Sequence, residues 1–221
     1  MKLLFSALSK FLMGLFLVGA LIFIPAGSLK YMNGWLFIGL LFVPMLILGA
    51  VLLLKSPNLL EKRLGAREEE KTQKGVVAAA GLIFVAGFII AGLDFRFGWS
   101  TIHNGIVFSA SVILLISYAL YAEVMRENAY LSRTVEVQEG QKIIDSGLYG
   151  IVRHPMYAVT VWLFLSIPLV LGSLWAFLCF ALYLPIIVVR ILNEEKVLEE
   201  GLSGYIEYKK RVKYRLFPFI W

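Results

Sequence analysis

The stretch YAVTVWLFLSIPLVLGSLWAFLCFALYLPIIVV, residues 157–189, decides the fold of this chain. It is about 33 residues long and contains no Lys, Arg, Asp or Glu. At a rise of about 1.5 Å per residue a single helix would be about 50 Å long, whereas the hydrocarbon core of a bilayer is about 30 Å thick. Pro168 and the turn sequence LGSLW at residues 171–175 interrupt the run. The stretch therefore predicts two short helices, over about 157–171 and 174–190, that form a hairpin.

Four further apolar runs precede this stretch, at about residues 3–26, 32–54, 75–93 and 105–125. Each has about 19 to 24 residues, enough for one helix to cross a bilayer. The chain is 60% hydrophobic and 16% charged, against about half and about a quarter in soluble domains. The first run has no convincing A-x-A cleavage site, so we interpret it as a span and not as a signal peptide. We expect an all-α, polytopic integral membrane protein with four full transmembrane helices followed by the short hairpin.

The basic residues test this topology. Six Lys and Arg lie between Lys55 and Lys74, four between Arg126 and Arg153, and seven from Arg190 onward, whereas the loops near residues 30 and 96 carry one each. Basic loops face the cytoplasm, and all three basic segments share the face of the N-terminus only if the hairpin crosses and returns. We therefore expect both termini to be cytoplasmic. The loop 55–74 itself is interpreted as a solvated or interface-lying connector without a function of its own.

Several function classes are disfavoured. The net charge of +6 is accounted for by basic residues beside spans, so no nucleic-acid partner is expected. Cys179 is the single cysteine and His103 and His154 are the two histidines, which argues against a disulfide and against a metal site. No P-loop and no GxGxxG between a strand and a helix is present, so a soluble nucleotide-binding domain is not expected.

A first polar cluster is GQKIIDSGLYGIVRHPMY, residues 140–157. Pro155 suits the first turn of a helix, where a missing N–H costs nothing. His154 then lies at the N-cap region, beside free N–H groups that attract carboxylates and phosphates. The alternative is that His154 and its basic neighbour only anchor a helix at the interface, with Tyr149 and Tyr157 in an aromatic belt.

Two more clusters follow the hairpin. In RILNEEKVLEE, residues 190–200, Arg190 and Glu194 are four apart and share a helix face, whereas Glu195 points about 100° away. Such a pair can bind an anion and a cation side by side; the alternative is a stop-transfer arginine followed by a solvated amphipathic helix. The tail GYIEYKKRVKYRLFPFIW, residues 204–221, mixes tyrosines with basic residues. It is typical of an interface-bound lid that contacts anionic lipid headgroups.

In this order and spacing, SGLYGIVRHPMY, the hairpin-length run, R-x-x-x-EE and GYIEYKKRV resemble the isoprenylcysteine carboxyl methyltransferase family of integral membrane enzymes. Phospholipid N-methyltransferases have a similar C-terminal module. The resemblance covers about residues 126–221. The four apolar runs predict a transmembrane region at 1–125, and the resemblance implies a methyltransferase module at 126–221, made of a loop, the hairpin and a cytosolic cofactor-binding tail.

The resemblance also implies a cofactor, S-adenosyl-L-methionine, and a set of residues. Arg190 would face the substrate as a binding and catalytic residue. The chemistry of an amine acceptor, and not the resemblance, adds Glu195 as a second catalytic residue. The residues that would bind the cofactor are Gln141, Lys142, Ile143, Ile144, Tyr149, His154, Pro155, Met156, Tyr157 and Glu194.

The methyl acceptor is left open by the residues. A carboxylate is ionised at neutral pH and needs no general base, and Arg190 can hold it bidentately. An amine has to lose a proton; Arg190 would then bind a lipid phosphate while Glu195 accepts that proton. We favour carboxyl O-methylation of a prenylcysteine-like or other lipophilic acceptor. Phosphatidylethanolamine-type N-methylation and methylation of a small thiol are the alternatives.

The lipophilic acceptor is expected to enter from the bilayer, through a gap beside the short hairpin next to Arg190. A more distant alternative is a non-enzymatic transporter or assembly factor. That reading predicts paired charges deep within several spans, but Glu123, Arg126 and Asp94 lie near helix ends.

Overall fold

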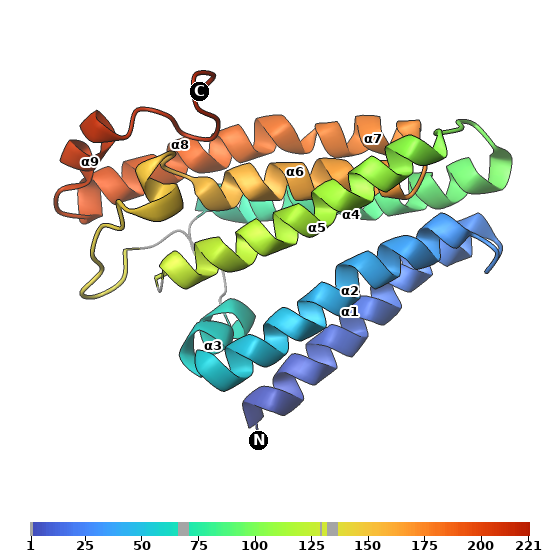
Figure 1. Ribbon diagram of the computed structural model, residues 1–221, viewed down its shortest axis with the longest axis horizontal. Coiled ribbons are helices and arrows are strands. Elements are labelled where there is room, and N and C mark those ends of the chain that lie inside the picture. The colour runs from blue at the N-terminus through green and yellow to red at the C-terminus, as the bar shows by residue number, and fades with distance from the viewer. Residues whose placement is uncertain (1, 66–70, 129, 132–136) are drawn as a thin grey trace.

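The computed structural model describes the backbone of residues 2–65, 71–128, 130–131 and 137–221. Side chains are described for all of these except residues 62, 65, 71 and 72. The described residues form helices and contain no β-strand. In chain order the elements are α1 (Lys2–Ala26), α2 (Met32–Lys55), α3 (Pro57–Gly65), α4 (Lys71–Phe97), α5 (Asn104–Glu127), the 3-10 helix η1 (Gly147–Gly150), α6 (Pro155–Val170), α7 (Leu174–Ala181), α8 (Tyr183–Gly201) and α9 (Tyr205–Arg211) (Figure 1).

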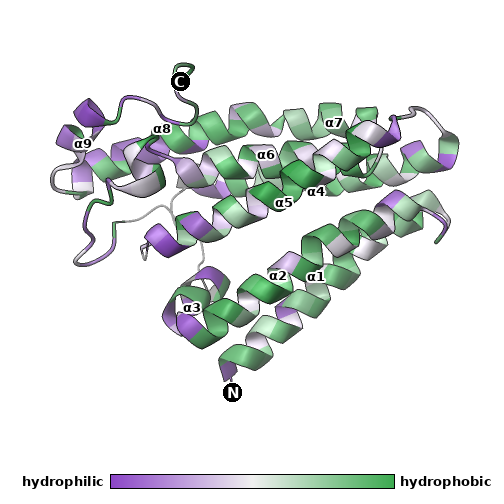
Figure 2. Cartoon of the chain, viewed as in Figure 1, coloured by the Kyte–Doolittle hydropathy of each residue, from purple (hydrophilic) through white to green (hydrophobic). Residues whose placement is uncertain are grey.

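Five segments are long and apolar enough to cross a membrane: α1, α2, most of α4, α5, and α7 with α8 together. The first four correspond to the four predicted full spans. Apolar residues cover these helices, whereas hydrophilic residues gather on α3, α9 and the nearby loops (Figure 2). The prediction of an all-α integral membrane protein is confirmed for the described residues.

The hairpin differs from the prediction in its second arm. Its first arm, α6, has 16 residues and is about 24 Å long, less than a hydrocarbon core. The second arm, α7 and α8, runs from Leu174 to Gly201 over 28 residues, well past the expected end near residue 190. The arm is broken at Leu182, and Pro185 follows in the first turn of α8, where it has no N–H for the preceding turn. The helix continues beyond the apolar run because residues 190–201 are strong helix formers.

Both ends of the bundle are assembled from distant parts of the chain. The start of α1, together with α3, η1 and α9, lies at one end, and the α1–α2, α4–α5 and α6–α7 connections lie at the other (Figure 1). The basic segments therefore share an end with the N-terminus, as the charge pattern predicts. Which end faces the cytoplasm stays a prediction.

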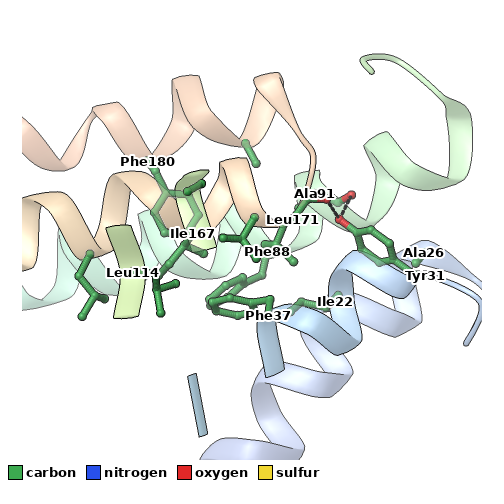
Figure 3. Close-up of a cluster of buried hydrophobic side chains, with 14 residues drawn as sticks. Ile22, Ala26, Tyr31, Phe37, Phe88, Ala91, Leu114, Ile167, Leu171 and Phe180 are labelled. Carbon is green, nitrogen blue, oxygen red and sulfur yellow. Dashed lines mark hydrogen bonds between the residues drawn. The ribbon is translucent and has the colours of Figure 1, made fainter. Parts of the chain in front are cut away.

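The main hydrophobic core lies towards the end that carries the α6–α7 turn. Phe37, Phe88 and Phe180 come from three different helices and meet there (Figure 3). The Tyr31 hydroxyl donates to the carbonyl of Leu171 at 2.5 Å, so α2 is tied to the end of α6.

A buried carboxylate closes the same end. Asp94 accepts hydrogen bonds from the backbone N–H of Ser100 at 2.7 Å and from its hydroxyl at 2.6 Å. It also accepts from the hydroxyl of Ser173, the N-cap residue of α7. Asp94 therefore fastens the α6–α7 turn to the end of α4, which fixes the hairpin against the spans.

Candidate active site

A polar cavity lies at the end opposite this core. It is enclosed by the chain that follows α5, by η1 and the start of α6, and by α8 and α9. The lining residues are Asn128, Tyr130, Leu131, Gln141, Lys142, Ile143, Ile144, Tyr149, Arg153, His154, Met156, Tyr157, Glu194, Leu198, Leu202, Tyr205 and Tyr208.

The residues predicted to bind a cofactor line this polar cavity, with the exception of Pro155. Pro155 is the buried first residue of α6, where its ring favours the helical backbone. The structure therefore brings the two sequence clusters together around one space. Their role in binding stays a prediction.

The position of Tyr149 is set by a turn that Glu127 holds. The Glu127 carboxylate accepts from the N–H of Leu148 at 2.9 Å and 3.2 Å. Gly147 has φ +56°, a backbone conformation that favours glycine, and a Cβ there would clash with the Glu127 carboxylate. The Tyr149 hydroxyl accepts from Asn128 Nδ2 at 3.0 Å. Burial raises the pKa of Tyr149 above its usual value, so the ring stays neutral.

The start of α6 is paired with the C-terminal segment through backbone hydrogen bonds. The N–H of Arg153 donates to the carbonyl of Tyr214, and the N–H of His154 donates to that of Arg215, both at 2.9 Å. The Arg153 guanidinium also donates to the carbonyls of residues 212–213 at 2.8 Å. Arg153, which the sequence leaves between pocket and anchor, therefore holds the C-terminal segment while it lines the polar cavity.

The acidic side of the polar cavity is formed by Glu194. The Tyr157 hydroxyl donates to the Glu194 carboxylate and accepts from Arg190 Nε at 2.9 Å. His154 Nδ1 lies 4.0 Å from Glu194 Oε1. Arg190 does not line the polar cavity; it lies behind Tyr157, and its Nη1 also donates to Gln73 on α4 at 3.0 Å. Glu194 thus faces the polar cavity with its orientation fixed by Tyr157.

Glu195 is placed differently from its predicted catalytic role. Its Oε1 lies 2.7 Å from Arg153 Nε, and its Oε2 lies 2.9 Å from Arg215 Nε. His154 Nε2 lies 3.3 Å from Oε1 as well. The side chain is 3% exposed and does not line the polar cavity. Since both oxygens are engaged by these groups, we interpret Glu195 as a residue that joins α8, α6 and the C-terminal segment.

Two tyrosines of α9 cover the polar cavity. The Tyr208 hydroxyl donates to the carbonyl of Tyr149 at 2.8 Å. The Tyr205 hydroxyl is buried and has no hydrogen-bond partner among the described residues. Burial raises the pKa of both side chains, and for Tyr205 the charges of Glu195 and Glu194 raise it further. Both hydroxyls are therefore neutral.

Some lining residues were not predicted. Asn128 is a polar residue directly after the apolar run of α5, and this position was a usable signal. Leu198 lies four residues after Glu194 and therefore on the same face of α8. Tyr205 and Tyr208 stood out in the sequence only as interface residues.

The comparisons with known proteins agree with the sequence motifs. Residues 107–200 match the sequence model of the isoprenylcysteine carboxyl methyltransferase (ICMT) family, which confirms the resemblance over that segment. The match runs from α5 into the end of α8 and leaves out α9.

Two curated relatives each match about two fifths of this chain. The uncharacterized protein YpbQ of Bacillus subtilis (strain 168) is 30% identical over 92 residues, 41% of this chain and 55% of that protein. The Delta(14)-sterol reductase TM7SF2 of Mus musculus is 30% identical over 91 residues, 40% of this chain and 22% of that protein. The match thus spans about half of the first relative and about a fifth of the second.

Proposed function

We propose that this integral membrane protein is an S-adenosyl-L-methionine-dependent methyltransferase whose cofactor occupies the polar cavity. The family match over residues 107–200 supports a methyltransferase. The observation that carries the cofactor proposal is the wall of the polar cavity, which is lined by Glu194 and by Tyr205, whose buried hydroxyl has no hydrogen-bond partner among the described residues.

The chemistry of these residues fits the cofactor. S-adenosyl-L-methionine supplies a methyl group on a positively charged sulfur and carries an amino-acid group and an adenosine. Glu194 can pair with a positive group, and the faces of Tyr149 and Tyr157 can contact a cation or stack on a base. The backbone of residues 141–144 offers hydrogen-bonding groups along the opposite wall. Tyr205 would gain the partner that its hydroxyl lacks.

The residues of this chain contribute positioning and exclusion of water. Tyr157 holds Glu194 in place because its hydroxyl donates to Glu194 and accepts from Arg190. Tyr205 and Tyr208 cover the polar cavity from α9. Methyl transfer to an ionised acceptor needs little more than alignment and a dry site.

For the acceptor we propose carboxyl O-methylation of a prenylcysteine-like or other lipophilic acid. The amine alternative requires a proton acceptor, and Glu195, the residue predicted for it, is engaged by Arg153 and Arg215. A carboxylate acceptor needs no such group. Phosphatidylethanolamine-type N-methylation and methylation of a small thiol remain the alternatives.

Calorimetric titration with S-adenosylhomocysteine tests the cofactor site. Detergent-purified protein should bind this product, and Glu194→Gln should weaken binding at least about tenfold, since a charged partner is worth about 1.5–3 kcal/mol. Glu199→Gln is the matched control, because Glu199 also lies on α8 but pairs with Lys209 outside the polar cavity. Absence of binding by the unaltered protein would overturn the proposal.

Labelled S-adenosyl-L-methionine identifies the acceptor. The protein is incubated with an S-farnesylcysteine analogue, with phosphatidylethanolamine or with a small thiol. A base-labile labelled product from the first acceptor supports ester formation. A base-stable product from one of the other two replaces our assignment with N- or S-methylation.

A further inference from the structure

A second hollow, which we call the apolar groove, lies between α2, α3, α5 and α6. Its lining residues are Leu41, Met45, Leu48, Gly49, Leu52, Leu60, Arg63, Leu64, Tyr118, Tyr121, Met125, Thr160, Leu163 and Phe164. Arg63 is the one charged residue among the described residues that line it. Apolar walls with a single cation suit an amphiphile that has a long chain and an anionic group.

Arg63 reaches the apolar groove from α3, in the loop expected to have no function. The helix is held against the first two spans: Leu60 is buried, and Lys10 Nζ donates to the carbonyl of Leu64 at 2.5 Å. The Arg63 guanidinium donates to the Tyr121 hydroxyl and lies 5.4 Å from the centre of that ring. α3 therefore positions a half-buried cation beside α5.

The apolar groove and the polar cavity meet at the start of α6. Arg63 Nη1 lies 3.9 Å from Met156 Sδ, and Met156 lines the polar cavity. Thr160, one helical turn further along α6, lines the apolar groove. A molecule lying in the apolar groove with its anionic group at Arg63 would thus end beside the wall of the polar cavity.

The expected entrance beside Arg190 stays a prediction, and the apolar groove lies elsewhere. Arg190 lines neither the apolar groove nor the polar cavity. It faces α4, where Gln73 pairs with it through Oε1 at 3.0 Å and through Nε2, which donates to the Arg190 carbonyl at 3.3 Å. On the α2–α5 side of α6, by contrast, the described residues bring an apolar hollow and a cation together.

We propose that the apolar groove holds the hydrocarbon chain of the methyl acceptor and that Arg63 binds the acceptor's anionic group. This assignment rests on the proposed function and specifies the class of its substrate: the acceptor is an anionic amphiphile. Arg63 is here a specificity-determining residue, supplied by α3 from outside the segment that matches the family. A guanidinium holds a carboxylate or a phosphate through two parallel hydrogen bonds.

Filling the apolar groove tests the chain-binding part. A Cβ at Gly49 meets nothing within 4 Å, and the same holds for Gly39 on the same helix, which lies outside the apolar groove. Gly49→Leu should therefore fold and should weaken binding of an S-farnesylcysteine analogue at least about fivefold, since several apolar contacts are displaced. Gly39→Leu should bind it like the unaltered protein. Equal binding by both variants would remove the apolar groove as the chain site.

Charge selection is tested by titrating the same analogue and its methyl ester. Arg63→Gln should weaken binding of the free acid about tenfold and leave binding of the ester unchanged, and Arg63→Lys should restore part of the affinity. Arg126→Gln is the control, because Arg126 is exposed and paired with Glu123. Equal weakening of acid and ester, or none, would overturn the role of Arg63.

The methyltransferase proposal and the groove proposal can be overturned independently of each other. S-adenosylhomocysteine binding should be the same in Gly49→Leu, in Arg63→Gln and in the unaltered protein. Normal cofactor binding with acceptor binding that ignores Gly49 and Arg63 overturns the groove alone. Binding of the analogue that depends on Arg63, without any cofactor binding, overturns the methyltransferase and supports the groove as a site for anionic amphiphiles.

Discussion

Tyr205 and Tyr208 are three residues apart on α9, but their hydroxyls are in different situations. That of Tyr208 donates to the carbonyl of Tyr149, whereas that of Tyr205 is buried without a partner in the described part of the chain. An unpaired buried hydroxyl costs about 1–3 kcal/mol. The ligand-free protein is therefore destabilised at Tyr205, and a ligand that forms a hydrogen bond with this hydroxyl would remove the destabilisation.

We expect Tyr205→Phe to leave the apparent Tm unchanged or raise it slightly, because no hydrogen bond is lost. The same change should weaken S-adenosylhomocysteine binding about three- to tenfold, the worth of one neutral hydrogen bond. Tyr208→Phe is the comparison: it leaves the Tyr149 carbonyl unpaired and should lower the Tm. Thermal unfolding in detergent with and without S-adenosylhomocysteine measures both effects. A clear loss of stability in Tyr205→Phe would contradict this account.

Predictability from sequence differs among the site residues. Glu194, His154 and Tyr157 belong to motifs whose residue types and spacing point to a polar site. Glu195 shows the limit of this reasoning: helix spacing places Glu194 and Glu195 on different faces of α8, but it does not tell which neighbours each face meets. Only the arrangement around α8 separates the one that faces the polar cavity from the one that Arg153 and Arg215 engage.

Among the helices, the α6–α7 turn depends on one carboxylate. Asp94 at the end of α4 accepts hydrogen bonds from Ser100 and Ser173. Because the turn is also where the main core gathers, this contact fixes the hairpin at the end far from the polar cavity.

Asp94→Ala should destabilise the protein by about 2–4 kcal/mol, since the donors of the half-buried Ser100 and the buried Ser173 lose their acceptor. The apparent Tm in detergent should fall by several degrees, while S-adenosylhomocysteine affinity in the folded protein stays unchanged. Lys30→Ala, a change of an exposed side chain at the same end, serves as the control. A loss of affinity without a change in Tm would indicate that this end communicates with the site.

The long helices were predictable because each apolar run is long enough to decide its own structure. The second arm of the hairpin was not, because the charges after residue 190 mark the end of apolar character and not the end of the helix. α3 was missed for a related reason: its charged loop has no apolar run, and its helix is stabilised by packing on α1 and α2.

As a whole, the molecule places its hydrophobic core at one end and its polar cavity at the other. The order of the motifs predicted which segments form the cavity. The pairing of residues 153–154 with 214–215 could not be predicted, because backbone groups make it and no side-chain pattern encodes it.

Alkaline pH should destabilise the cavity end. Burial raises the pKa of Tyr149, Tyr205 and Tyr208, so the folded state holds these protons more tightly than the unfolded state does. Their contribution to stability is complete below the ordinary tyrosine pKa of about 10 and is lost as the pH rises towards the raised values. The apparent Tm should fall above about pH 10, less steeply in Tyr205→Phe. A Tm independent of pH up to about pH 11 would contradict this.

The backbone pairing between the start of α6 and residues 214–215 has a consequence for biosynthesis. All helices that cross the membrane precede α9 in the chain, so the ribosome can deliver them to the bilayer while the cavity still lacks a wall. The polar cavity closes only after Tyr205, Tyr208 and the segment paired with Arg153 and His154 have been translated. Insertion of the helices into the membrane can therefore precede the formation of a complete ligand-binding site.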